Sequence, residues 1–157
     1  MNEPEYFRNP AEFFTAVETH FAFLKKDYGF EIESTDEVGP ECSIVFVNAT
    51  TIVIVHYEIG GTPWIELRPR RPEAVPKGAV PRCDMMFVVE ELAPTQAAML
   101  WEGPLNGSDP VNALRALSGA LREFGHDILR GDFTIFSVIT ERVREAGEER
   151  SRRLFRS

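Results

Sequence analysis

The sequence lacks the short motifs that mark common nucleotide-binding and hydrolytic sites. It has no GxxxxGKS or GxxxxGKT phosphate loop, no GxGxxG turn, no HExxH pair and no GxSxG nucleophile turn. It has only three histidines, His20, His56 and His126, and their neighbours show no metal-ligand spacing. The sequence therefore predicts no metal and no cofactor, and no motif identifies a catalytic residue.

Cysteine is scarce and long apolar runs are missing. Cys42 and Cys83 form no CxxC pair, so we expect two free thiols in a reducing compartment, with a disulfide between them as the lesser alternative. Apolar stretches such as residues 52–55 are far too short to span a bilayer. Residues 1–5 show no signal-peptide pattern. We therefore expect a cytoplasmic protein without a membrane partner.

Acidic residues outnumber basic residues, and the formal net charge is -8. Such a charge repels phosphate backbones, so we expect no binding to nucleic acid. The exception to test is the tail, where Arg150, Arg152, Arg153 and Arg156 lie close together. Acidity suits a basic protein partner, although it is also common in proteins that have none.

The chain is long enough for one domain with a normal core. Its 157 residues are 43% hydrophobic and include twelve phenylalanines, which indicates an aromatic-rich interior. No repeat or low-complexity tract divides the chain. We therefore treat residues 1–157 as a single domain.

The N-terminal part reads as a helix over residues 10–28. Asn9 is suited to cap it, Pro10 stands where helices tolerate proline, and Gly29 is suited to end it. Apolar residues recur at helical spacing. They are Phe13, Phe14, Val17, Phe21 and Leu24.

A β region follows, with short polar turns that favour antiparallel pairing. The expected strands are 30–34, 43–47, 52–59 and 64–68. Odd-numbered residues of the last two share an apolar character and should face the core. They are Val53, Val55, Tyr57, Ile59, Ile65 and Leu67.

Matching these faces suggests a register for the hairpin. It places Tyr57 opposite Ile65 and Val55 opposite Leu67, with residues 60–62 as a three-residue loop. Residues 69–82 hold four prolines and no hydrophobic period, which predicts a loop.

The segment 83–92 is ambiguous between a helix and a last strand. We favour a helix capped by Asp84, with Met85, Val88, Val89 and Leu92 pointing inward. Two more helices are expected near the C-terminus, capped by Asp109 and Asp132. The predicted fold is α+β: an antiparallel sheet of three to four strands, with the N-terminal helix and the two C-terminal helices packed on one face.

The other face of the sheet is the candidate site. It should carry Ile54, His56, Glu58, Trp64, Glu66 and Arg68, with His56 opposite Glu66 and Glu58 opposite Trp64. Trp and Arg are residue types that anchor partner proteins, and a His–carboxylate pair can support acid–base chemistry. The simplest interpretation of the same pattern is an ordinary solvated sheet face.

Three short segments have a familiar order at this chain length. They are Phe23-Leu24 leading to Tyr28-Gly29-Phe30, then Val55-His56-Tyr57-Glu58, then Gly131-Asp132-Phe133. This layout resembles a diffuse group of short uncharacterised bacterial proteins, some of which look like immunity proteins encoded beside secreted toxins. The resemblance implies a non-catalytic domain that binds a protein, such as a basic toxin or a second copy of itself. The alternative is a small enzyme or ligand-binding domain that uses His56, Glu58 and Glu66.

Overall fold

The computed structural model describes residues 6–107 and 109–155 and contains one antiparallel sheet. Its order is β1-β2-β3-β4-β5, so each strand pairs with the next one along the chain. The prediction of an α+β fold with an antiparallel sheet is confirmed, but the sheet has five strands rather than three to four. The strands are β1 (Glu31–Val38), β2 (Glu41–Val47), β3 (Thr51–Glu58), β4 (Trp64–Pro69) and β5 (Cys83–Asp84).

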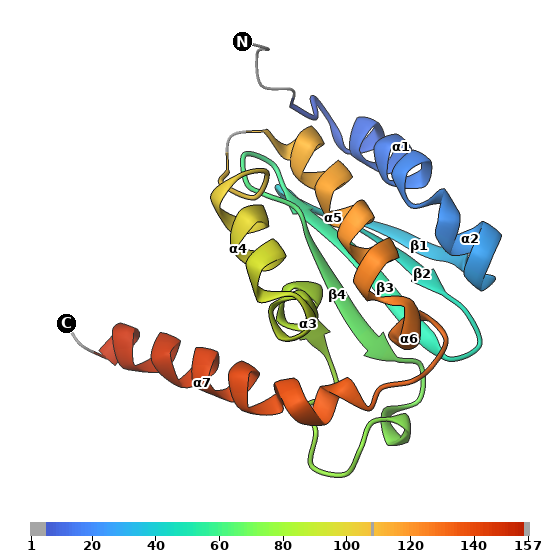
Figure 1. Cartoon of the computed structure of the whole chain (residues 1–157). Coiled ribbons are helices and arrows are strands. Elements are labelled where there is room, and N and C mark those ends of the chain that lie inside the picture. Colours follow the sequence, from blue (N-terminus) through green and yellow to red (C-terminus); the bar gives the residue numbers. More distant parts are fainter. Residues whose placement is uncertain (1–5, 108, 156–157) are drawn as a thin grey trace.

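The helices lie on one side of this sheet. In Figure 1, α1, α4 and α5 lie in front of the strands, and α7 runs past α3 and away from the sheet. A short 3-10 turn, η1 (Pro72–Ala74), interrupts the loop after β4. The helices are α1 (Pro10–His20), α2 (Ala22–Tyr28), α3 (Met85–Leu92), α4 (Pro94–Glu102), α5 (Pro110–Phe124), α6 (His126–Leu129) and α7 (Ile135–Phe155).

Odd-numbered residues of β3 and β4 face the core, as predicted. Val53, Val55 and Ile65 are fully buried, and Tyr57 is 2% exposed. The Tyr57 ring stacks on Phe13 of α1 with 5.2 Å between centroids. Aromatic residues therefore pack together where the first helix meets the sheet.

The predicted register of the β3–β4 hairpin is wrong by two residues. Val55 pairs with Ile65 and Val53 with Leu67, across a five-residue connection at 59–63. After Glu58 the Ile59 N–H donates to the Pro40 carbonyl in the β1–β2 turn, and the chain then turns, with the Gly61 N–H donating to the Glu58 carbonyl. Its side chain is 48% exposed instead of facing the core. A two-residue shift preserves which side chains share a face, so the facing is right although the pairing is not.

The first predicted helix is two helices that meet at Phe21. Asn9 accepts the Glu12 N–H at its start, and Gly29 ends α2 with φ of 69°. Phe21 and Phe23 are both buried. Residues two apart lie about 200° apart around a straight helix, so the break lets both rings enter the core.

Most of segment 83–92 forms a helix, the alternative that the sequence favoured over a last strand. Asp84 closes β5 and caps α3 by accepting the Met86 N–H, as predicted. Leu92, expected inside, is 54% exposed at the end of α3. The next helix, α4, was not predicted, because Ala97 is its only fully buried residue and it has no apolar stripe.

The C-terminal helices begin near their predicted caps. Asp109 accepts the Asn112 N–H, and Asp132 accepts the Thr134 N–H just before α7. α7 packs against α3, and its outer half is exposed. Two tail arginines, Arg152 and Arg153, pair with glutamates four residues earlier. Arg156 and residues 1–5, to which two sequence predictions refer, lie outside the described residues.

The β2–β3 turn is tied to two distant helix ends through Asn48. The Asn48 amide donates to the carbonyls of Tyr28 and Leu129, at 3.0 and 3.1 Å. Beside it, the Thr51 hydroxyl donates to the Ile128 carbonyl at 2.7 Å. Gly131 packs against the same turn, where an added Cβ would lie 2.8 Å from the Thr50 Cβ. We call these contacts the Asn48 clasp.

Candidate functional site

The candidate site lies on the sheet face opposite the buried one, which we call the uncovered face. Its side chains are mostly half-buried, whereas those on the helix side are almost fully buried. In the observed register Val45, Ile54 and Glu66 form one row, and His56 lies opposite Trp64 in the next. On β2, β3 and β4 the uncovered face consists of Glu41, Ser43, Val45, Val47, Ile52, Ile54, His56, Glu58, Trp64, Glu66 and Arg68.

His56 and Trp64 form a stacked pair across β3 and β4. Their ring centroids are 4.9 Å apart with 16° between the planes, and Trp64 remains 37% exposed. The predicted pairing of His56 with Glu66 is wrong; Glu66 is diagonal to it, with 3.9 Å between Nε2 and Oε1. Burial lowers the pKa of His56, while the charges of Glu66 and Glu41 act the other way. The imidazole is therefore mainly neutral at pH 7 and stabilises the exposed indole by stacking.

Glu66 and Arg68 continue the same face along β4. The Arg68 Nε lies 3.5 Å from Glu66 Oε2, and this buried nitrogen has no hydrogen-bond partner within residues 6–107 and 109–155. Glu58 does not lie opposite Trp64, because β4 begins across from His56. It faces Glu41 of β2 instead. The two carboxylates add negative charge at the end of the sheet that carries Trp64.

The loop after β4 does not fold back over Trp64. The Val80 N–H donates to the Thr140 hydroxyl, and Arg144 donates to the Gly78 carbonyl. These bonds hold the loop against α7. The loop leaves the Pro69 end of β4, whereas Trp64 stands at its beginning.

The hollow beside Trp64 is small. It encloses about 150 Å³ and is lined in part by Asp36, Glu41, Ser43 and His56. Pockets that bind small molecules usually measure about 300–1,000 Å³ and bury most of the ligand. A larger groove of about 580 Å³ lies elsewhere, between the α1–α2 junction and β1. The uncovered face is thus better shaped for a broad contact than for a small substrate.

The sequence placed Ile54 on the uncovered face but missed its aliphatic neighbours. Val45, Val47 and Ile52 lie beside Ile54, which is 5% exposed between its cross-strand neighbours. The signal was the unbroken apolar run at 52–55, since a strand with one solvated face should alternate. These residues turn a polar face into one with an apolar centre.

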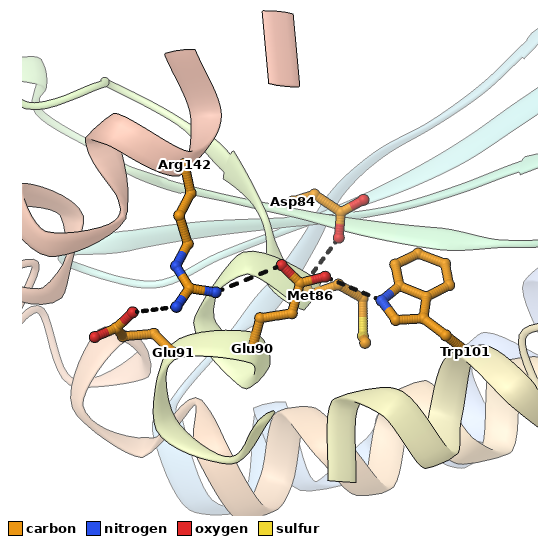
Figure 2. Close-up of polar contacts among 6 residues, drawn as sticks. All are labelled: Asp84, Met86, Glu90, Glu91, Trp101 and Arg142. Carbon is orange, nitrogen blue, oxygen red and sulfur yellow. Dashed lines mark hydrogen bonds and ion pairs between the residues drawn. The ribbon is translucent and has the colours of Figure 1, made fainter. Parts of the chain in front are cut away.

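A second polar cluster, also missed, joins three helices at the β5 edge (Figure 2). Glu90 of α3 accepts the Trp101 indole N–H at 3.0 Å, and Arg142 of α7 lies 3.0 Å from Glu91. Burial, with the nearby charges of Glu90 and Glu66, raises the pKa of Asp84 to about 6 despite its bond from Met86. The residues come from β5, α3, α4 and α7, so no local pattern could reveal the cluster.

The two cysteines are buried free thiols. Cys42 lies on β2 and Cys83 on β5, with β3 and β4 between them. Burial raises the pKa of both thiols, which makes them poor nucleophiles at neutral pH.

Comparisons with protein-family models, curated proteins and solved structures found no match for this chain. No described helix combines the length and apolar character that a bilayer crossing requires. Within residues 6–107 and 109–155, no group of three or more His, Cys, Asp or Glu side chains could hold a metal ion.

Proposed function

We propose that this chain is a non-catalytic protein-binding domain whose uncovered face contacts a partner. One observation carries the proposal: an apolar sheet centre stands beside an exposed Trp64, and the hollow next to Trp64 measures only about 150 Å³. An apolar patch rimmed by polar groups is typical of protein interfaces. The strand backbone also holds Trp64 and its stacked His56 in place before binding, which reduces the entropy lost on association.

The charges around the uncovered face favour a basic partner. Glu58 and Glu41 face each other beside Trp64, and Glu66 lies next to His56. The whole chain carries a formal charge of -8, so a cationic protein is attracted and nucleic acid is repelled. A cytoplasmic immunity-type protein that neutralises a basic toxin is the most specific form of this proposal. It rests on the resemblance of the three sequence segments.

The enzymatic alternative around His56, Glu58 and Glu66 has weaker support. The His56 and Glu66 side chains are 3.9 Å apart, beyond hydrogen-bonding distance. Glu58 follows His56 on β3 and lies opposite Glu41 of β2 rather than beside Glu66 of β4. The hollow of about 150 Å³ is too small to enclose an ordinary substrate.

The test compares Trp64→Ala with Trp101→Ala, the other exposed tryptophan. Each variant loses one modest contact, to His56 or to Glu90, so each should lower stability by about 1 kcal/mol. Binding to the product of a neighbouring gene, and self-association, would be followed by sedimentation with thermal melts alongside. We expect Trp64→Ala to weaken association about 30-fold or more, as loss of an interface anchor does, and Trp101→Ala to leave it unchanged. Equal effects of the two variants on association, or a large loss of stability without one, would refute the proposal.

A further inference from the structure

β1 is an open edge of the sheet, and its unpaired side faces away from β2 and the strands that carry Trp64 and His56. It pairs with β2 on one side only, and seven of its eight side chains are exposed. α1 packs on β2 instead, and Figure 1 shows β1 as the outermost strand on the side of α1 and α2. A long edge strand offers free backbone N–H and C=O groups to another strand.

The groove of about 580 Å³ runs beside this edge. Its apolar lining includes Phe21, Phe30 and Phe46, and Ile32 of β1 is 43% exposed there. Ile32 pairs with Phe46, so both side chains lie on the helix side of the sheet. A strand added next to β1 would therefore place its own helix-side residues in the groove.

The pairing surface has a defined length. A bulge between Ile32 and Ser34 interrupts the ladder, and residues 34–38 pair regularly with β2. At roughly 3.3 Å per residue, an extended segment of about eight residues reaches from this stretch to the groove at Ile32. The groove thus receives one end of such a segment.

The charge of β1 selects the occupant. The strand carries four carboxylates and no basic residue, and only Lys25 at the groove is cationic. Pairing with β1 of a second copy would bring eight carboxylates onto adjacent strands, which is destabilising. A cationic segment would instead place positive charges beside them. The carboxylates are those of Glu31, Glu33, Asp36 and Glu37.

We propose that β1 docks an extended basic segment of a partner protein, which adds as a sixth strand and inserts apolar side chains into the groove beside Ile32. Main-chain hydrogen bonds supply affinity in this mode, and the groove and the carboxylates supply selectivity. The groove shares no lining residue with the hollow beside Trp64, and the unpaired side of β1 faces away from β2, so neither proposal depends on the other.

The test uses a fluorescent acetylated and amidated (Val-Lys)4 peptide as the probe, followed by anisotropy. (Pro-Lys)4 is the control peptide, because it has equal charge but lacks alternate backbone N–H donors. Glu33→Lys/Glu37→Lys is compared with Glu102→Lys/Glu145→Lys, which makes the same charge change at exposed positions on α4 and α7. We expect (Val-Lys)4 to bind the wild type, with about tenfold weaker binding for the β1 variant and for (Pro-Lys)4. The control variant should stay within about threefold.

Amide hydrogen exchange locates the peptide. Bound (Val-Lys)4 should slow exchange in residues 34–38, and Trp64→Ala should leave its affinity unchanged. Equal weakening by both double variants would show general charge attraction and overturn the proposal. Protection on β3 and β4 instead of β1 would also overturn it. A dimer that Glu33→Lys/Glu37→Lys abolishes would assign the edge to a second copy instead.

Discussion

The two edges of the sheet are protected in different ways. At one edge β5 is only two residues long, and the chain turns at once into α3, which packs against β4 and α7. At the other edge β1 is eight residues long, and four carboxylates and a bulge are what protects it. Covering removes an edge from solvent, whereas charges and bulges only discourage unwanted strands from pairing. The β5 edge is thus built for stability, and the β1 edge remains available for contact.

The largest expected effect is at the covered edge. Met85 follows β5 directly and is 1% exposed, so Met85→Ala should destabilise the domain by about 2–5 kcal/mol. Leu92→Ala, on the same helix but 54% exposed, should cost within about 0.5 kcal/mol. Urea unfolding of both variants measures the difference. Similar small losses would mean that α3 does not seal this edge.

A smaller effect, of opposite sign, is expected for Asp84→Asn at the same edge. The folded protein raises the pKa of Asp84 from 3.8 to about 6, so it binds the proton more tightly than the unfolded chain does. The contribution of this group to stability is therefore greatest below about pH 4 and is lost as the pH rises towards 6. About two pKa units correspond to about 3 kcal/mol of destabilisation at pH 7.

Asparagine removes the charge but can still accept the Met86 N–H, since it caps helices as well as aspartate does. Asp84→Asn should therefore be more stable than the wild type by up to about 3 kcal/mol at pH 7, with the gain disappearing near pH 4. Denaturant unfolding from pH 4 to 8 tests this. A difference that does not vary with pH would contradict the shifted pKa.

The smallest effect is expected at the open edge. Ile32 of β1 is 43% exposed, so Ile32→Ala should change stability by less than about 0.5 kcal/mol. Ile44→Ala on the neighbouring strand is the control, because Ile44 is fully buried and its loss should cost several times more. A loss above about 1 kcal/mol for Ile32→Ala would show that β1 belongs to the core rather than to a docking edge.

Local chemistry predicted the parts of the fold that depend on it. Asn9, Asp84 and Asp109 each accept a backbone N–H at the helix start that the sequence indicated. Alternation assigned the faces of β3 and β4, including Tyr57 inside and Trp64 outside. Caps and faces are decided by a residue and its near neighbours, so a sequence pattern contains them.

Features set by distant contacts were missed. The register error arose because face matching cannot distinguish pairings that differ by two residues, and the Ile59 N–H bonds to Pro40, outside the hairpin. The strand prediction ended at residue 34, although β1 continues to Val38. With both faces of β1 exposed, its sequence shows no alternation to detect. For the candidate site, His56, Trp64, Glu66 and Arg68 were correctly placed on one face, whereas the groove at β1 depends on where α1 and α2 meet.

The order of the strands also has a kinetic meaning. Each strand pairs with its sequence neighbour, and β1 to β4 are joined by short loops whose closure entropy is small, so this part of the sheet can form by successive pairing. The Asn48 clasp is different, since its bonds to Ile128 and Leu129 span 77 and 81 residues. Contacts of such long separation require the largest loss of chain entropy before they contribute. The sheet can thus form with little conformational search. Most of the conformational search in folding this chain is needed to dock the C-terminal helices on the β2–β3 turn.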